Sequence, residues 1–182
     1  MTEKQIAREI DDYYYKNAEG TSFDTIVASG ENSSKPHAVP TDRKIQTTDI
    51  ITIDMGCKVN GYCSDMTRTI FMGCILEEIK PIYDLVLKNQ LLTTREMREY
   101  ANIKMLSSIS ETDFKVNGYD LIHAVGHGIG LEVHERPIIS FKNDTFLKEN
   151  MVLANEPGIY LPGKYGVRIE DTFLLKNDGI ET

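Results

Sequence analysis

Four acidic residues stand in runs of otherwise apolar, strand-forming residues: Asp54, Asp65, Glu156 and Glu170. Asp is disfavoured inside strands, and an ionised carboxylate that is buried without a partner is very costly. Any one of these acids alone would more often be an exposed carboxylate at the edge of a hairpin. Four of them in similar surroundings instead predict a site where positive charge is concentrated.

The positive charge that these acids require exceeds what nearby side chains offer. Arg68 and Arg168 could each compensate one carboxylate, which leaves two of the four uncompensated. A pair of divalent cations would neutralise all four. Two such ions about 3.5–4 Å apart can share a hydroxide that is nucleophilic near neutral pH, the usual route to hydrolysis of an amide or a phosphate ester.

Histidine is a further residue that could bind metal ions in such a site. The chain has four histidines, and His123, His127 and His134 lie together in the segment IHAVGHGIGLEVHERP. A single histidine is more often structural than a ligand. Glycine on both sides of His127, however, lets the backbone pack closely and brings its imidazole near another element. Four carboxylates and one imidazole suit Mn, Co, Fe or Zn with five or six ligands, and not a tetrahedral structural zinc. These residues alone therefore predict a dinuclear hydrolase and leave open the bond that it cleaves.

Two other motifs in the same segment are incomplete. His134-Glu135 begins like the H-E-x-x-H of zinc peptidases, but Ile138 stands where the second histidine is needed. The G-x-G-x-G string at residues 126–130 lacks a preceding strand and the further glycine of a dinucleotide-binding loop. Neither a thermolysin-type zinc site nor a Rossmann nucleotide site is therefore expected.

The composition is that of one globular domain. The chain has 182 residues, 41% of them hydrophobic, and a formal net charge of -8, so it can bury a core and lacks the basic excess that binds a phosphate backbone. No apolar run approaches the ~20 residues of a membrane span, and the N-terminus has no apolar signal segment. Cys57, Cys63 and Cys74 match neither a zinc motif nor a redox motif. Free thiols in a reducing compartment, the cytoplasm, are therefore expected, with no nucleic-acid or membrane partner.

Helices are expected at the start and in the middle of the chain. Residues 3–17 have apolar residues on one face, and residues 77–90 and 94–108 have helical composition. The second helix should begin near Glu78, because Pro81 is tolerated only in the first turn of a helix.

Strands are expected on both sides of these helices, at residues 23–29, 50–55, 64–72, 151–159 and 167–175. The glycines and the Asn-Gly pair between the second and third strands predict a hairpin. A turn built around YLPGKYG joins the last two. Strands near both ends of the chain with helices between them predict an α+β fold and not a βαβ repeat.

Four strings carry a family resemblance that runs from about Gly20 to Asp171: GTSFDTIVASGENSSKPHAVPTDR, IITIDMGCKVNGYCSDMTRTIFMG, AVGHGIGLEVHERP and NEPGIYLPGKYGVRIED. In this order they resemble the Xaa-Pro aminopeptidase and prolidase family of pita-bread dinuclear metallopeptidases. The resemblance implies a creatinase/aminopeptidase-like α+β fold, in which helices cover antiparallel sheets. It also implies that residues 1–182 form a single metallopeptidase catalytic domain that is truncated at its N-terminus, without the family's first helix and N-terminal domain.

The same resemblance assigns a role to each residue of the acidic site. The implied metal ligands are Asp54, Asp65, His127, Glu156 and Glu170. In that family Asp65 and Glu170 would bridge the two ions, whereas His127 and Glu156 would serve one of them. Glu156 would also be the general base that takes a proton from the bridging water.

Three histidines and one arginine match the family's substrate site. His37, His123 and His134 would bind substrate, and His37 and His134 are also expected to be catalytic. His134 would stabilise the tetrahedral intermediate. Arg168 would brace the ligand network and contribute to substrate binding. The string VRIED around the last acid favours the proline-directed enzymes over methionine aminopeptidases.

The resemblance therefore predicts a metal-dependent peptidase that hydrolyses the bond between an N-terminal residue and proline by means of a metal-bridging hydroxide. Two divalent metal ions per chain are expected, with Mn preferred and Co, Fe or Zn as alternatives. The expected partners are a small peptide with proline at its second position, and a second copy of the chain or a complementing N-terminal segment. A methionine aminopeptidase, and a non-catalytic truncated peptide-binding module, are the alternatives.

Overall fold

Three α-helices and a set of short strands make up the computed structural model, which describes residues 1–74, 77–177 and 179–181. The helices are α1 (Glu3–Asn17), α2 (Lys80–Glu96) and α3 (Ile103–Val116), and a short 3-10 helix, η1, spans Gly30–Ser34. The strands are β1 (Ile26–Ser29), β2 (Ile50–Met55), β3 (Lys58–Val59), β4 (Tyr62–Cys63), β5 (Met66–Phe71), β6 (Gly126–Gly128), β7 (Glu135–Ile139), β8 (Val152–Asn155), β9 (Gly158–Leu161), β10 (Tyr165–Arg168), β11 (Asp171–Lys176) and β12 (Gly179–Glu181). Every strand pairing among these elements is antiparallel, which confirms the predicted α+β class.

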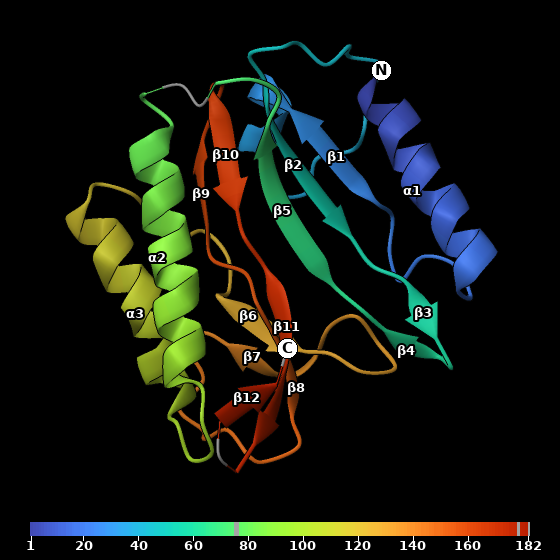
Figure 1. Cartoon of the computed structure of the whole chain (residues 1–182). Helices are drawn as coiled ribbons and strands as arrows, with labels where there is room; N and C mark the ends of the chain where they lie inside the picture. The colour runs from blue at the N-terminus through green and yellow to red at the C-terminus, as the bar shows by residue number, and fades with distance from the viewer. Residues whose placement is uncertain (75–76, 178, 182) are drawn as a thin grey trace.

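The N-terminal half contains a three-stranded sheet in the order β1-β2-β5 (Figure 1). The predicted hairpin between β2 and β5 is confirmed, and Asp54 pairs with Thr67 across it. The hairpin extends into the small ribbon of β3 and β4, where Asn60 and Gly61 turn the chain with φ values of 53° and 79°. Only a residue that tolerates positive φ fits such a turn, which is why Asn-Gly occurs there. The strand predicted at residues 23–29 is shorter, since β1 begins at Ile26.

Helix α1 has the bounds that the sequence predicts and packs on this sheet. Thr2 and Gln5 cap it reciprocally: the Thr2 hydroxyl accepts from the Gln5 backbone N–H, and the Gln5 side chain accepts from the Thr2 backbone N–H. Ala7 is buried in one cluster with Val27 of β1 and Ile51 of β2. The apolar face of α1 thus fixes the helix to the strands that lead to the site.

The C-terminal half contains a five-stranded sheet in the order β12-β11-β8-β6-β7 and the hairpin of β9 and β10. Helices α2 and α3 pack against these strands. One buried cluster joins Val86 of α2 and Phe114 of α3 to Val167 of β10. A second joins Leu106 of α3 to Leu153 of β8. The core of this half therefore lies between α2 and α3 and the strands that flank Glu156 and Glu170.

Each of the last two predicted strands is divided in two at its acidic residue. The strand predicted at 151–159 is β8 and β9, with Glu156 between them, and the strand predicted at 167–175 is β10 and β11, with Glu170 between them. At these breaks the Glu156 N–H donates to the Val125 carbonyl (2.7 Å) and the Glu170 N–H donates to the Thr67 carbonyl (3.1 Å). The chain thus leaves one ladder and joins another at each acid, which places both carboxylates at junctions between sheets.

The helix boundaries in the middle of the chain differ from the prediction. Helix α2 has Pro81 in its first turn, as expected, but continues to Glu96, beyond the predicted end at residue 90. The helix predicted at residues 94–108 is α3, which begins at Ile103 after an Asn102 cap. Tertiary contacts explain the longer α2, because Thr93 is fully buried and the Thr94 hydroxyl accepts from Asn155 Nδ2 (2.8 Å). Threonine is a poor helix former in isolation, and packing overrides that preference here.

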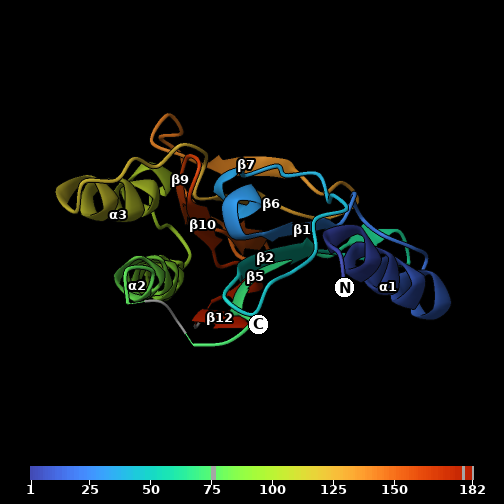
Figure 2. The same ribbon diagram turned by 90° about the horizontal axis from the view of Figure 1, so that it is seen from above.

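The two halves meet along β5 and β10. The Thr69 hydroxyl of β5 donates to the Arg168 carbonyl (2.8 Å), and the Arg168 N–H donates to the same hydroxyl (3.1 Å). Seen from above, α1 lies on one side of the strands and α2 and α3 lie on the other (Figure 2). The strands between these helices bring residues from both ends of the chain together.

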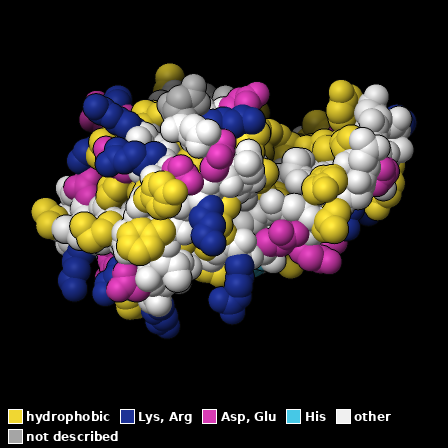
Figure 3. Space-filling view, turned by 90° about the horizontal axis from the view of Figure 1, so that it is seen from below, with side chains coloured by type: hydrophobic (Ala, Val, Ile, Leu, Met, Phe, Trp, Pro, Cys, Tyr) yellow, Lys and Arg dark blue, Asp and Glu magenta, His cyan; other side chains and the backbone are white. Residues whose placement is uncertain are grey.

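The surface seen in Figure 3 mixes charges of both signs. Lys and Arg side chains are interspersed with Asp and Glu side chains and with separate apolar side chains on this face. Among the described residues, no helix combines the length and the apolar character that a membrane crossing requires.

Candidate active site

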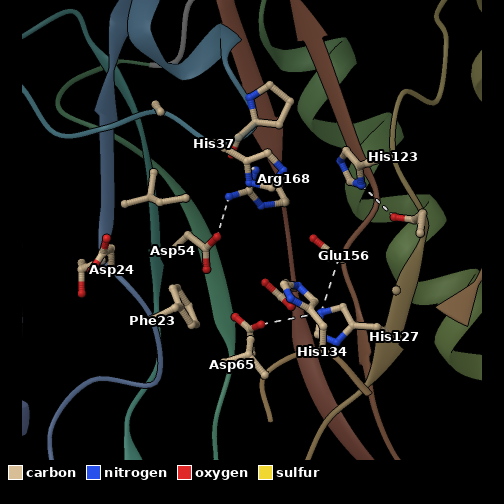
Figure 4. A pocket seen from close by; sticks show the side chains of 18 of the residues that line it. Phe23, Asp24, His37, Asp54, Asp65, His123, His127, His134, Glu156 and Arg168 are labelled. Carbon is tan, nitrogen blue, oxygen red and sulfur yellow. Dashed lines mark hydrogen bonds and ion pairs between the residues drawn. The ribbon is translucent and has the colours of Figure 1, made fainter. Parts of the chain in front are cut away.

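The five predicted metal ligands lie together in one cavity between the two halves of the molecule. Asp54, Asp65, His127 and Glu156 are labelled in Figure 4. Asp54 is on β2, and Asp65 directly precedes β5. His127 is in the middle of β6, and Glu156 and Glu170 occupy the two strand breaks. His127 Nε2 is 3.7 Å from Asp65 Oδ2 and 3.6 Å from Glu156 Oε1. Residues more than a hundred positions apart in sequence thus face a common centre.

Their ligand atoms form overlapping groups. Asp54, Asp65 and Glu170 can each place a carboxylate oxygen within 4.8 Å of the other two. The same holds for one ligand atom each from His127, Glu156 and Glu170. Glu170 belongs to both groups, and a shared carboxylate between two groups is the arrangement that a pair of neighbouring cations requires.

Three carboxylate oxygens at this centre are buried without a hydrogen-bond donor among the described residues: Asp54 Oδ1, Asp65 Oδ1 and Glu170 Oε1. The second oxygens of two of these groups are satisfied, since Asp54 Oδ2 accepts from Arg168 Nη2 (2.7 Å) and Glu170 Oε2 accepts from Thr67 Oγ1 (2.7 Å). A buried anionic oxygen without a donor is costly unless a cation neutralises it. The possible metal ligands, mostly carboxylate oxygens with one imidazole, fit divalent cations such as Mn²⁺.

Burial and mutual repulsion make these carboxylates hard to ionise in the absence of a cation. Burial, followed by the charges of Asp54 and Glu156, raises the pKa of Asp65 to about 8. Burial, together with the charge of Asp54, raises the pKa of Glu156 to about 7. The pKa of Glu170 is also raised well above its usual value, first by burial and then by its acidic neighbours. Nearby positive charge from bound cations would oppose each of these shifts.

His127 is oriented so that one ring nitrogen faces the acids. Its Nδ1 lies 3.0 Å from the Gly128 carbonyl, to which it donates, and this leaves Nε2 directed at Asp65 and Glu156. Such a second contact fixes the tautomer that a ligating imidazole needs. The glycines beside His127 are required by close packing, as predicted, because a Cβ on Gly126 would lie 2.0 Å from the Ala154 carbonyl oxygen.

Arg168 connects the acids to His123, a predicted substrate-binding residue, through a buried network. Its Nη2 donates to Asp54 (2.7 Å), its Nε donates to Thr67 Oγ1 (3.1 Å), and its Nη1 donates to the Tyr160 hydroxyl (2.7 Å). The Tyr160 hydroxyl in turn lies 3.0 Å from His123 Nε2. Burial lowers the pKa of His123 to about 4, so its ring is neutral and Nε2 accepts from Tyr160.

Thr67 and Tyr160 belong to this network, and the sequence patterns did not single them out. Both lie in strings that carry the family resemblance, but a threonine or a tyrosine in a strand is ordinary, and no role was assigned to either. The only available signal was position: Thr67 follows Asp65 by two residues, and Tyr160 follows Glu156 by four.

The expectation that Arg68 helps to compensate the acids is wrong. Arg68 pairs with Asp171 and donates to the backbone carbonyl of Glu170, and its side chain does not reach the four carboxylates. Successive side chains point to opposite faces of a strand. Thr67 and Thr69 point toward the site, so Arg68, which lies between them, points away from it. Arg168 is therefore the arginine that contacts the acidic centre, which leaves more of the negative charge for cations.

The cavity has a volume of about 530 Å³, within the usual range for small-ligand sites. All of the predicted metal, catalytic and substrate residues line it: His37, Asp54, Asp65, His123, His127, His134, Glu156, Arg168 and Glu170. His134 stands at the exposed edge, with its ring centroid 4.3 Å from that of His127. Apolar side chains, among them Phe23 and Val39, complete the wall.

Comparisons with known proteins point to one family. A model described as metallopeptidase family M24 matches residues 1–177. The Xaa-Pro dipeptidase of Pyrococcus furiosus is 43% identical over 180 residues, which make up 97% of this chain and 52% of that protein. An uncharacterised peptidase of Methanocaldococcus jannaschii is 42% identical over 188 residues, covering 100% of this chain and 53% of its own length. The chain thus spans about half the length of the relatives that it matches.

Solved structures give the same result for the fold. X-Pro aminopeptidase from Thermotoga maritima superposes with a TM-score of 0.96 at 43% identity, over 100% of this chain and 52% of that one. Aminopeptidase P from E. coli superposes with a TM-score of 0.90 at 26% identity, over 100% of this chain and 48% of that one. These matches confirm the predicted pita-bread fold of antiparallel sheets covered by helices.

Proposed function

The chain belongs to metallopeptidase family M24, and we propose that it hydrolyses the peptide bond between an N-terminal residue and proline. The observation that carries this proposal is the set of three buried carboxylate oxygens, on Asp54, Asp65 and Glu170, that have no donor in the described part of the chain and lie next to His127 and Glu156. These five side chains would hold two divalent metal ions. When bound, the ions neutralise the carboxylates and make a water molecule nucleophilic near neutral pH.

Individual residues of the chain would supply the other catalytic roles. Glu156 takes a proton from the attacking water, since its carboxylate lines the cavity beside His127 and the other acids. Glu170 would be shared by the two ions, since it belongs to both ligand groups. Asp65, which also has a ligand atom within 4.8 Å of His127 and His134, would be the second shared ligand. His134, at the open edge, donates a hydrogen bond to the oxygen on which negative charge develops.

The rest of the cavity would bind the peptide. Phe23 and Val39 form apolar walls for side chains, and His37 and His123 lie along the same cavity. His123 is neutral and held in one orientation by Tyr160, so it presents a fixed flat face for a proline ring. The relatives named Xaa-Pro dipeptidase and X-Pro aminopeptidase support proline as the second residue of the substrate.

The finer features of the site belong to the same proposal. Manganese is the proposed metal, because the ligands are mostly oxygens and an imidazole is present. Residues 1–182 are proposed to act as one catalytic domain in the cytoplasm, paired with a second copy or with a complementing N-terminal segment.

Peptide cleavage by the purified chain tests this function. The chain is loaded with Mn²⁺ and incubated with an Ala-Pro dipeptide, an Ala-Pro-Xaa tripeptide and a Met-Ala-Ser tripeptide, and a chelator-treated sample serves as the control. We expect metal-dependent cleavage of a proline peptide and little turnover of Met-Ala-Ser. Preferential release of methionine would favour a methionine aminopeptidase. A folded, metal-loaded chain that cleaves none of the peptides would overturn the proposal in favour of a binding module.

A further inference from the structure

Glu3, in the first turn of α1, is a charged side chain that is completely buried. Its two carboxylate oxygens accept six hydrogen bonds from three residues. Oε1 accepts from the backbone N–H and the hydroxyl of Ser29 (both 2.7 Å) and from Asn32 Nδ2 (3.1 Å). Oε2 accepts from Asn32 Nδ2 (3.0 Å) and from the backbone N–H (2.9 Å) and hydroxyl (2.6 Å) of Thr41.

The Ser29 and Thr41 donors lie at the two ends of a single loop, and Asn32 lies in η1 near its beginning. Ser29 is the last residue of β1, and Thr41 follows the segment Pro36–Pro40, so the carboxylate joins the beginning and the end of residues 29–41. The middle of the loop is held from the other half of the molecule, where Arg168 Nη1 donates to the Pro36 carbonyl (3.0 Å). The loop is therefore anchored at its base by Glu3 and at its far side by a residue of the site.

The same loop forms one wall of the active-site cavity. Pro36, His37, Ala38, Val39 and Pro40 all line it. The His37 side chain is exposed, and no hydrogen bond to it is found among the described residues. Its position therefore depends on the backbone that carries it. Besides the two anchors, that backbone is held by the Gly166 N–H, which donates to Ser33 Oγ (2.9 Å), and by the Lys4 N–H, which donates to the Thr41 carbonyl (3.1 Å).

A role for Glu3 in helix stability alone does not explain this arrangement. The N-terminus of α1 is already capped by Thr2 and Gln5. Burying a carboxylate is costly even when it is hydrogen-bonded, and an apolar side chain would hold a helix to a sheet at lower cost. Glu3 also has no free oxygen for a cation, because both oxygens have several donors. The function that this geometry serves is to close the loop.

Arg43 supports the charge of Glu3. It donates to the Ser29 hydroxyl (2.6 Å), which itself donates to Glu3, and it forms an ion pair with the buried Asp49. Burial alone would raise the pKa of Glu3, but hydrogen bonds from Thr41 and Ser29 outweigh it and lower that pKa. The carboxylate is thus ionised at neutral pH, the state in which it accepts all six hydrogen bonds.

We propose that Glu3 is a positioning residue for substrate binding, which closes residues 29–41 and thereby holds His37 in the wall of the cavity. This inference rests on the peptidase function proposed above, because it assigns His37 a role in binding peptide. It adds a residue that affects substrate binding although it lies in α1, outside the proposed metal centre.

The test compares Glu3→Gln with Glu9→Gln, which makes the same charge change at an exposed position of the same helix. Hydrogen exchange of the full chain measures the loop directly. We expect faster exchange at residues 35–41 in Glu3→Gln than in Glu9→Gln, with metal content unchanged in both. Thr41→Val, which removes one hydroxyl donor, should change exchange in the same direction to a smaller degree and serves if Glu3→Gln does not fold.

A double-mutant cycle then separates positioning from general stability. We expect Glu3→Gln to lower kcat/KM for an Ala-Pro peptide roughly 10-fold in the wild-type background and less than about 2-fold in the His37→Ala background. Unchanged exchange at residues 35–41 in both Glu3→Gln and Thr41→Val would overturn the inference, and so would equal losses of kcat/KM in the two backgrounds. A wild-type chain without peptidase activity would instead overturn the proposed function, and with it this role of Glu3.

Discussion

Two groups of buried carboxylates in this molecule are surrounded in opposite ways. Glu3 accepts six hydrogen bonds, and each of its oxygens has more than one donor. Asp54, Asp65 and Glu170 each keep one buried oxygen without any donor among the described residues. A buried carboxylate that accepts all of its hydrogen bonds from the protein stabilises the surrounding structure. A buried carboxylate with an oxygen that lacks a hydrogen-bond donor is available to bind a cation.

The pKa values of the two groups differ accordingly. Hydrogen bonds lower the pKa of Glu3 despite its burial, whereas burial and neighbouring acids raise the pKa of Asp65 to about 8. The protein therefore stabilises negative charge at the base of the loop of residues 29–41 and destabilises it at the centre of the acidic site. Bound cations would remove that destabilisation, so metal binding and the folded state should be strongly coupled.

Replacing Asp65 with Asn has the largest expected effect, because it removes a charge from the group that lacks donors. We expect Asp65→Asn to lose bound metal and at least roughly 1,000-fold in kcat. Metal content by mass spectrometry and peptide turnover are measured on the same sample. Glu3→Gln is the matched control, since it removes a carboxylate from the other group and should retain its metal. Asp65→Asn with normal metal content and activity would show that the ligand assignment is wrong.

Replacing His134 tests a residue at the exposed edge of the cavity that lies next to Asp65 and His127 but is not one of the five predicted ligands. We expect His134→Ala to retain its metal and to lose roughly 100-fold in kcat, because a hydrogen-bond donor to the developing negative charge is removed. Steady-state kinetics on an Ala-Pro peptide measure this change. If kcat stays within a factor of two of wild type, His134 has no catalytic role.

Replacing Tyr160 tests the link between the two ends of the network. Tyr160→Phe leaves Arg168 without one acceptor and leaves His123 Nε2 without its donor. We expect roughly a 10-fold fall in kcat/KM for proline peptides, with the metal retained. Loss of metal in this variant would mean that the network holds the ligands and not the substrate side chains.

The smallest expected effect is on the pH dependence of stability in the metal-free chain. Asp65 and Glu156 have folded-state pKa values of about 8 and about 7, above their unfolded values of 3.8 and 4.5, so the folded chain binds protons that the unfolded chain releases. Stability should therefore fall as pH rises from 7 to 8, by about 1 kcal/mol or roughly 3 °C in Tm. Glu3 and Asp49 have lowered pKa values, so their contribution is present above pH 5 and is lost only in acid.

Thermal unfolding with a chelator, and then with added Mn²⁺, measures this difference. Mn²⁺ should remove the decline between pH 7 and 8 and leave the decline in acid. A metal-free Tm that is constant from pH 7 to 8 would contradict the raised pKa values at the centre.

Residue types, their spacing and the family resemblance predicted much of this molecule. Helix α1, strand β2 and the hairpin to β5 follow from local periodicity and an Asn-Gly turn, and the predicted site residues line one cavity. Acids in apolar strands and a histidine between glycines are visible in sequence because they conflict with local preference. Such conflicts tend to occur where function requires them.

The features that were missed depend on contacts distant in sequence. The strand breaks at Glu156 and Glu170 arise because backbone groups there pair with a different sheet. The longer α2 reflects the burial of Thr93, and the contribution of Tyr160 depends on its contacts with Arg168 and His123. Glu3 likewise looks like an ordinary acid in a first helical turn until its donors are known. Local patterns carry no information on such partners.

Titration of the metal-free chain with Mn²⁺ by calorimetry, with metal content measured by mass spectrometry after dialysis, tests the central claim most directly. If the carboxylates without donors form a dinuclear site, wild type and Glu3→Gln bind about two ions per chain and Asp65→Asn binds fewer. A wild-type chain that is folded and binds no Mn²⁺, or an Asp65→Asn chain that binds as much as wild type, would contradict the account.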